Sequence, residues 1–197
     1  MIRSIDSVGK LLITCGLSGS GKSTLVRRAL NAYPDKLDYM NTLTTRPRRE
    51  NEDGVEETFV TQEEYNQAKY QAASWDESVI YGNYYGLSPD KYIDIMNNGK
   101  SLMLCSIPSN DIIENMARIY GRERIETIHL MTPLALAAER LIDRDISMEI
   151  GRLAIDKELT PPDGSINFQS DFVFEPSGAL QKDMVRFANL VGGILNG

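Results

Sequence analysis

The sequence has few of the residues that build disulfide frameworks, zinc centres or membrane spans. It holds two cysteines, Cys15 and Cys105, and one histidine, His129, among 197 residues. So few ligands argue against a disulfide framework or a zinc site. Both cysteines stand in apolar, strand-like runs, so we expect buried free thiols. The first apolar run, residues 11–15, is far too short for a signal peptide or a membrane span, and we therefore expect a cytoplasmic protein.

Positive charge is scarce as well. The chain carries 21 Lys and Arg against 28 Asp and Glu, a net charge of −7. This balance argues against a nucleic-acid or anionic-membrane partner, because both need a basic surface. A small phosphorylated ligand needs only a few well-placed arginines. We therefore expect a small-molecule acceptor and a monomer or homodimer, and the length fits one domain with small lobes.

Apolar strands alternate with helices along the chain, which predicts an α/β fold with a parallel sheet covered by helices on both faces. The expected strands are 10–15, 37–43, 101–107, 125–131 and 171–175, with a strand and turn over 78–85 around Gly82 and Asn83. The expected helices are 23–32, 61–73, 89–98, 110–120, 133–143 and 178–195. Within a single domain over 10–195, we expect a core of 10–41 and 89–195. The polar segment of about 42–88 is predicted to be a small inserted lobe, and about 145–165 a mobile lid.

The stretch GLSGSGKST, residues 16–24, follows a strand and opens a helix. Its Gly-x-x-x-x-Gly-Lys-Ser pattern predicts a phosphate-binding loop (P-loop), in which backbone N–H groups converge on phosphate oxygens. We expect Lys22 to reach the β- and γ-phosphates of a nucleoside triphosphate, here ATP, and the Ser23 hydroxyl to bind Mg²⁺. The residues expected to hold the nucleotide are Gly16, Leu17, Ser18, Gly19, Ser20, Gly21, Lys22, Ser23 and Thr24.

An arginine-rich turn follows, TTRPRR at residues 44–49, with GNYYG at 82–86 and DGVEETFVTQEEY at 53–65. Arginines bind phosphate oxygens in pairs, although the turn read alone is equally compatible with a solvated surface. Together with the phosphate loop, the helix LALAAERLIDR and the strand DFVF, these motifs resemble the guanylate kinase family from about residue 10 to 195. The resemblance implies a P-loop kinase fold with a nucleoside-monophosphate lobe and a lid.

The resemblance also implies which residues act. Arg46, Arg49 and Tyr85 would hold the acceptor's phosphate, with Thr42 and Asp76 reading its base. Arg140, Arg144 and Arg152 would close over the transferring phosphoryl group and neutralise its charge. Taken singly, Arg140 and Arg144 are equally well explained as a helix-face pair one turn apart.

The departures from the family pattern concentrate at the acceptor site. Leu87 replaces a hydroxyl, although Ser88 is adjacent, and Glu57 replaces a tyrosine that helps to hold the acceptor phosphate. The acidic base reader falls on Asp76, or alternatively on Ser74. Cys105 and Ile107 replace an Asp-x-Asp pair, and neither is a hard oxygen ligand. The lid is about three residues shorter than is usual in the family.

Three readings of function remain open from the sequence. The first is ATP-dependent phosphorylation of GMP, dGMP or a related nucleotide. The second is a kinase for a base-free sugar phosphate such as ribose 1,5-bisphosphate. The third is a non-catalytic guanylate-kinase-like binding module, against which the complete phosphate loop weighs. A nucleotide-hydrolysing switch is disfavoured because no water-positioning residue is convincingly placed.

Overall fold

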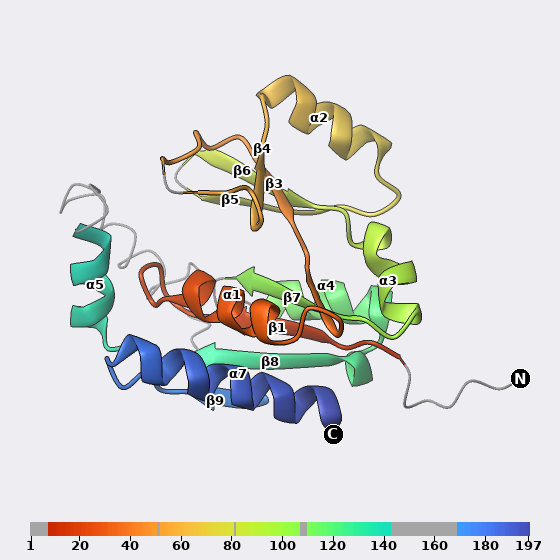
Figure 1. Ribbon diagram of the computed structural model, residues 1–197. Helices are drawn as coiled ribbons and strands as arrows, with labels where there is room; N and C mark the ends of the chain where they lie inside the picture. The colour runs from red at the N-terminus through yellow and green to blue at the C-terminus, as the bar shows by residue number, and fades with distance from the viewer. Residues whose placement is uncertain (1–7, 51, 81, 107–109, 143–168) are drawn as a thin grey trace, which may run out of the picture.

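The computed structural model describes residues 8–50, 52–80, 82–106, 110–142 and 169–197 (Figure 1). Two sheets organise these residues: a five-stranded sheet in the order β2-β7-β1-β8-β9 and a four-stranded sheet in the order β4-β3-β6-β5. In Figure 1 the smaller sheet, with its helix, stands above one edge of the larger layer.

All neighbouring strands of the larger sheet run parallel, as the alternation of strands and helices predicts. The central strand is β1, and its residue Leu11 pairs with Leu102 of β7 on one side and Ile125 of β8 on the other. The strands are β1 Leu11–Cys15, β2 Leu37–Tyr39, β7 Ser101–Ser106, β8 Ile125–Leu130 and β9 Phe172–Phe174. Every residue of β1 is buried, because helices cover both faces.

Alternate residues of β1 face two separate hydrophobic clusters. Leu12 packs with Val26 of α1 (Lys22–Ala32) and Phe187 of α7 (Leu180–Asn196). Leu11 and Ile13 pack on the opposite face with Met96 of α3 (Ile93–Asn97) and residues of α4 (Asn110–Tyr120). Helix α5 (Leu134–Ile142) lies at one end of the sheet in Figure 1. The five strands are thus held rigidly between two helical layers.

The smaller sheet is mixed. Strand β3 (Thr42–Thr44) runs parallel to β4 (Glu57–Phe59) and antiparallel to β6 (Asn83–Leu87), which forms a hairpin with β5 (Asp76–Ile80). Helix α2 (Gln62–Gln71) begins at Thr61 in a capping box with Glu64, as its sequence predicts. Buried Tyr65 anchors α2 by packing against Trp75 and Tyr84.

Three of the expected elements differ in detail. The strand and turn expected over 78–85 are the hairpin of β5 and β6, Asp76–Ile80 and Asn83–Leu87. The single strand expected over 37–43 is two strands, because the chain leaves the larger sheet after Tyr39 and enters the smaller one at Thr42. The helix expected over 89–98 begins as a 3-10 turn, Pro89–Tyr92, before α3. The segment 145–165, expected to be a lid, lies outside the described residues.

Both cysteines are free, as predicted, but Cys105 is only half-buried. Within the described ranges, no helix is long and apolar enough to cross a membrane.

Candidate active site

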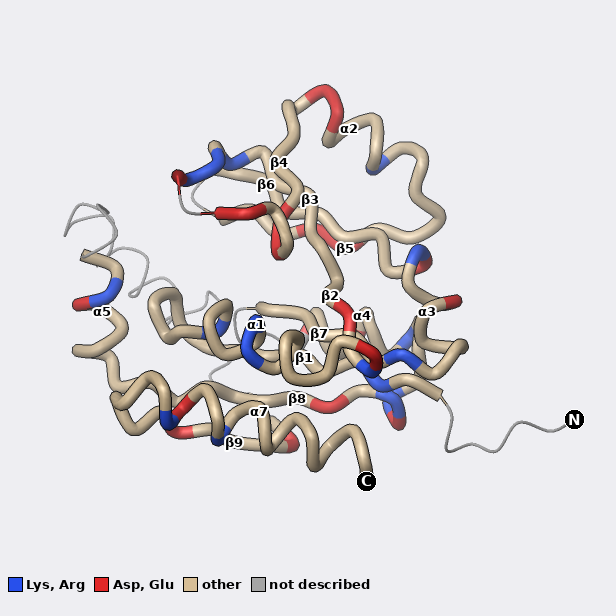
Figure 2. The backbone as a smooth tube through the Cα atoms, in the orientation of Figure 1, with Lys and Arg blue, Asp and Glu red and all other residues tan. Residues whose placement is uncertain are grey.

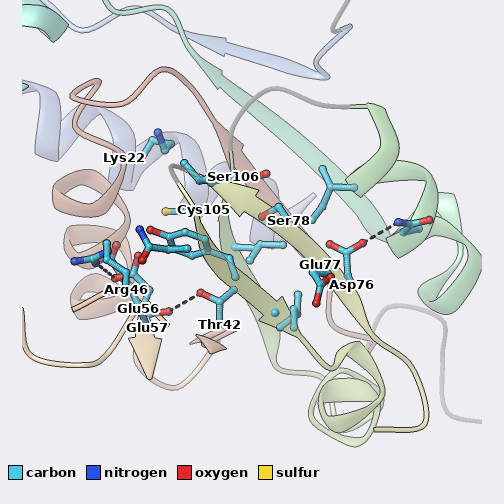
Figure 3. Close-up of a pocket in the computed structure, with 18 of the residues that line it drawn as sticks. Lys22, Thr42, Arg46, Glu56, Glu57, Asp76, Glu77, Ser78, Cys105 and Ser106 are labelled. Carbon is cyan, nitrogen blue, oxygen red and sulfur yellow. Dashed lines mark hydrogen bonds and ion pairs between the residues drawn. The ribbon is translucent and has the colours of Figure 1, made fainter. Parts of the chain in front are cut away.

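A cavity of about 670 Å³ lies between the two sheets (Figure 3). The larger sheet and its helices contribute Ser18, Lys22, Ser23, Tyr39, Leu104, Cys105, Ser106, Asp111, Ile112, Glu114, Asn115 and Arg118. The smaller sheet and its loops contribute Thr42, Arg46, Arg49, Glu56, Glu57, Asp76, Glu77, Ser78, Ile80, Asn83, Tyr85, Gly86 and Leu87. The cavity therefore brings the phosphate loop and the arginine turn, far apart in sequence, to a single site.

The phosphate loop joins the carboxyl end of β1 to the start of α1. Its lysine folds back on the loop: Lys22 Nζ donates hydrogen bonds to the carbonyls of Gly16, at 2.6 Å, and Leu17, at 3.0 Å. The side-chain oxygen of buried Ser20 has no hydrogen-bond partner among the described residues. A curled loop with a lysine on the cavity wall fits a polyphosphate.

Helix α5 supports this loop from outside the cavity. Arg140 Nη1 donates to the carbonyl of Ser20 at 3.1 Å, and the Thr132 hydroxyl donates to the same carbonyl at 3.0 Å. Gly19 has φ 79°, and a Cβ there would stand 2.3 Å from the carbonyl oxygen of Ala137. Glycine is therefore required at this position by both conformation and close approach.

Of the three arginines predicted to close over the transferring phosphoryl group, the structure describes one, Arg140. Arg140 contacts the phosphate-loop backbone and is not among the described residues that line the cavity. Arg144 and Arg152 lie outside the described residues. The role of the three in charge neutralisation stays a prediction.

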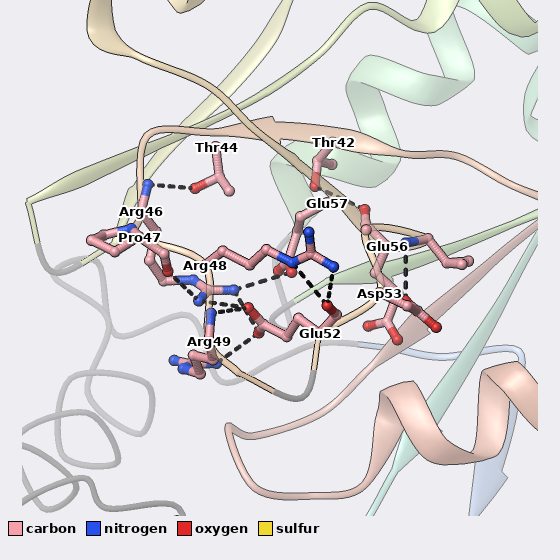
Figure 4. A network of polar contacts seen from close by, with 12 residues as sticks. Thr42, Thr44, Arg46, Pro47, Arg48, Arg49, Glu52, Asp53, Glu56 and Glu57 are labelled. Carbon is pink, nitrogen blue, oxygen red and sulfur yellow. Dashed lines mark hydrogen bonds and ion pairs between the residues drawn. The ribbon is translucent and has the colours of Figure 1, made fainter.

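The arginine turn is paired with the carboxylates of Glu52 and of Glu57, the first residue of β4 (Figure 4). Arg46 Nη2 lies 2.8 Å from Glu52 Oε1 and 3.1 Å from Glu57 Oε2, and its guanidinium stands over the Phe59 ring. Glu52 also pairs with Arg49 at 3.2 Å. Figure 2 shows the basic and acidic segments side by side between β3 and β4. The side chain of Arg46 is only 10% exposed, so these pairs fix its position.

Glu57 and Glu52 differ in their ionisation. Burial raises the pKa of Glu57, and the Arg46 charge only partly offsets this. Burial also opposes ionisation of Glu52, but the hydrogen bonds and charges of Arg46 and Arg49 together outweigh it and leave the pKa of Glu52 below its usual value. Of the two carboxylates on Arg46, Glu57 is therefore the one that takes up a proton more readily.

The opposite end of the cavity carries Asp76. Its Oδ1 accepts a hydrogen bond from Asn115 Nδ2 of α4 at 2.8 Å, which ties the small sheet to the core (Figure 3). Burial raises the pKa of Asp76, and the nearby Asp111 raises it further. Ser74, the alternative base reader, instead donates its hydroxyl to Asp90 at 2.7 Å and does not line the cavity.

The remaining residues predicted to bind the acceptor also lie at the cavity. Thr42 and Tyr85 line the cavity, and the Thr42 hydroxyl donates to the Glu56 carbonyl at 3.4 Å. Leu87 lines the cavity and is buried, whereas the Ser88 hydroxyl turns to Asp90 at 2.8 Å. The cavity surface at β6 is thus apolar where the family carries a hydroxyl.

Metal-binding capacity is limited. In the part of the chain that the structure describes, no group of three or more His, Cys, Asp or Glu could hold an ion. Cys105 lines the cavity, but burial raises the pKa of its thiol to about 12, so it is neutral and a poor ligand for Mg²⁺. Ile107 lies outside the described residues. Ser23 remains beside Lys22 on the cavity wall, where a hydroxyl ligand is expected.

Sequence reasoning missed the partners of the functional side chains. It found the arginines of the turn but not Glu52, which accepts from Arg46 and from the backbone N–H of Arg49. It also missed Asn115 and Arg27, whose guanidinium bridges from α1 to Asp53 at 2.8 Å. The three-residue spacing of Arg49 and Glu52 could have indicated the role of Glu52. The contacts of Asn115 and Arg27 depend on long-range packing, which the local sequence does not indicate.

A parallel sheet with a phosphate loop after its central strand, facing an arginine-bearing lobe, defines a P-loop kinase fold. The guanylate kinase family model matches residues 8–118, more than half of the chain, and every cavity-lining residue falls within that match. The chain belongs to the guanylate kinase family.

Similarity to individual proteins agrees with this assignment. Guanylate kinase of Chlorobium luteolum is 34% identical over 105 residues, which cover 53% of this chain and 53% of that protein. Guanylate kinase of Nitratidesulfovibrio vulgaris is 30% identical over 156 residues, 68% of this chain and 73% of that protein. The match spans about half the length of the first of these relatives.

A solved structure shares the fold. The guanylate kinase from Anaplasma phagocytophilum superposes with a TM-score of 0.65 at 19% identity, covering 97% of this chain and 88% of that one.

Proposed function

We propose that this protein transfers the γ-phosphoryl group of ATP to the phosphate of GMP, dGMP or a closely related nucleoside monophosphate. The observation that best supports this proposal is that one cavity is lined by the phosphate loop on one wall and by Arg46, Arg49 and Tyr85 on another. Family membership supports a nucleotide acceptor, because the relatives named above are guanylate kinases. The sugar-phosphate and binding-module readings have no such support.

At the donor side, the loop 16–24 would hold the polyphosphate through its backbone N–H groups and the positive end of α1. Lys22 would exchange its contacts with the Gly16 and Leu17 carbonyls for contacts with the β- and γ-phosphates. Ser23 would ligate Mg²⁺. ATP supplies the phosphoryl group, and Mg²⁺ offsets its negative charge.

At the acceptor side, Arg46 and Arg49 would orient the acceptor's phosphate with Tyr85, while Thr42 and Asp76 read the base. A phosphate oxygen is already anionic, so the chain need not supply a strong general base. Its residues act by positioning, by neutralising charge and by excluding water. Asn115 contributes by orienting the Asp76 carboxylate from the core.

The same proposal assigns roles to the parts of the chain. Residues 42–88 act as the acceptor-binding lobe, and 10–41 with 89–195 carry the donor site. The predicted lid at 145–165 would bring Arg144 and Arg152 to the transferring group. Cytoplasmic location, an oligomeric state of one or two chains and the lack of a nucleic-acid or membrane partner stay predictions.

The test is ADP formation from ATP and Mg²⁺ with a panel of acceptors. The panel contains GMP, dGMP, the other ribo- and deoxynucleoside monophosphates and ribose 1,5-bisphosphate, with a reaction lacking acceptor as control. We expect turnover with GMP or dGMP well above the control. Turnover confined to ribose 1,5-bisphosphate, or ATP binding with no transfer to any acceptor, would reject the proposal.

A further inference from the structure

Arg46, the arginine expected to grip the acceptor phosphate, already has two anionic partners. Its Nη2 lies 2.8 Å from Glu52 and 3.1 Å from Glu57, and its Nη1 lies 3.1 Å from Glu52 (Figure 4). A phosphate reaching Arg46 therefore meets a guanidinium whose charge is balanced. One of the two carboxylates must give way or be neutralised for full contact.

The two carboxylates are not equivalent. Glu52 accepts from Arg46, from the backbone N–H and side chain of Arg49, and its own carbonyl accepts from Arg48. It therefore organises the whole turn. Glu57 stands on β4, lines the cavity and, among the described residues, accepts a hydrogen bond from Arg46 alone. Glu57 is the partner that can leave without unfolding the turn.

We propose that Glu57 tunes the affinity of the acceptor site: its carboxylate competes with the acceptor's phosphate for Arg46 and so sets the KM for the acceptor. The inference rests on the proposed function, since it concerns the affinity of that acceptor. It explains what the replacement of the family's tyrosine by a carboxylate does in this chain. The raised pKa of Glu57 supports it, because a proton on Glu57 removes the competition.

The charges around Glu57 come from its neighbour Glu56 and from the loop before β4. Arg46 and Arg49 favour its ionised form, whereas Glu52 and Glu56 oppose it. Glu56 is itself held by Arg27 at 2.9 Å, so its charge stays in place when the acceptor binds. Lowering the pH should therefore protonate Glu57 and strengthen acceptor binding through Arg46.

The experiment compares wild type with Glu57→Gln, which keeps size and removes charge. For Glu57→Gln we expect the KM for GMP to fall about tenfold near pH 8, with kcat and the KM for ATP within about twofold of wild type. The matched control is Asp53→Asn, which removes a charge from the same loop. Asp53 pairs with Arg27 and does not line the cavity, so the KM for GMP should change less than about twofold.

Two further readouts separate competition from a general change in the lobe. Direct titration should show tighter binding of GMP to Glu57→Gln and unchanged binding of guanosine, which lacks the phosphate. The ratio of GMP affinities, variant to wild type, should fall towards one as the pH is lowered through the raised pKa of Glu57. Titration of the GMP phosphate and of Asp76 affects both proteins and cancels in this ratio.

The outcomes separate the inference from the proposed function. Wild type that turns over GMP, with Glu57→Gln showing an unchanged or higher KM, overturns the inference alone. Equal tightening of GMP and guanosine, or an equal effect of Asp53→Asn, overturns it as well. If neither wild type nor Glu57→Gln binds or phosphorylates any nucleoside monophosphate in the panel, the proposed function fails and the inference fails with it.

Discussion

Gly19, in the middle of the phosphate loop, gives a prediction whose size follows from two structural features. Its φ of 79° lies in the left-handed region, and a Cβ would stand 2.3 Å from the Ala137 carbonyl oxygen and 3.0 Å from Leu141 Cγ. In Gly19→Ala the conformational strain costs about 1 kcal/mol, and displacing a backbone carbonyl of α5 costs about 2 kcal/mol more. The sum, about 3 kcal/mol, corresponds to a fall in Tm of about 9 °C for a chain of this size.

Gly178 is the matched control, because it has φ 85° and nothing stands within 4 Å of an added Cβ. Gly178→Ala therefore carries the strain alone, about 1 kcal/mol, or a fall in Tm of about 3 °C. Thermal unfolding followed by circular dichroism measures both. Gly19→Ala should also raise the KM for ATP, because α5 holds the loop through Arg140. Equal Tm values for the two variants would refute the reasoning from close approach.

Three further predictions concern single side chains. Lys22→Met should lower the rate of single-turnover ADP formation about 10²- to 10³-fold, because one phosphate-binding donor is lost. The Tm should change little, because the fold is kept. A variant with the wild-type rate would contradict the assignment of Lys22 to the ATP site. Asp76→Asn should raise the KM for GMP at least about tenfold but not that for ATP. The ratio of kcat/KM for GMP, wild type over Asp76→Asn, should decline towards one as the pH falls through the raised pKa of Asp76, because Glu57 and the GMP phosphate titrate in both proteins. Burial opposes ionisation of Asp183, but hydrogen bonds from Ser177 and Arg186 outweigh it and keep the pKa of Asp183 low. The ionised Asp183 therefore stabilises the folded protein above the unfolded-state pKa. This stabilisation is lost as the pH falls through the lower folded-state pKa. Asp183→Ala should therefore cost about 2 kcal/mol in urea unfolding near pH 7 and progressively less in acid; a constant cost across pH would contradict this assignment.

At the acceptor end of the site, the sequence motifs match the guanylate kinase family, but the arginines already have carboxylate partners. The arginines stand where a phosphate is expected, yet their charge is balanced by Glu52 of the same loop and by Glu57 of β4. The base end carries Asp76, with a buried Leu87 in place of the expected hydroxyl. Measurements of acceptor KM are therefore more informative about this chain than measurements of ATP affinity.

Short-range features were predictable from the sequence because short-range physics creates them. The glycine spacing of residues 16–24 predicted a loop between strand and helix, and Thr61 with Glu64 predicted the start of α2. Continuous apolar runs predicted that β1 and β7 would be buried on both faces. The guanylate kinase resemblance was confirmed by the family match over residues 8–118.

What the sequence determined by itself is the fold class and the donor loop, since both arise from the order of elements and from backbone conformation over a few residues. Only the tertiary structure decided that Glu52 and Glu57 occupy Arg46, that Asn115 holds Asp76 and that the chain leaves the larger sheet between Tyr39 and Thr42. The pairs of Arg46 with Glu57 and of Asp76 with Asn115 join residues from different elements, and one charged side chain has many candidate partners along a chain. Which partner it meets is fixed by how the two sheets pack, and hydrophobic burial sets that packing.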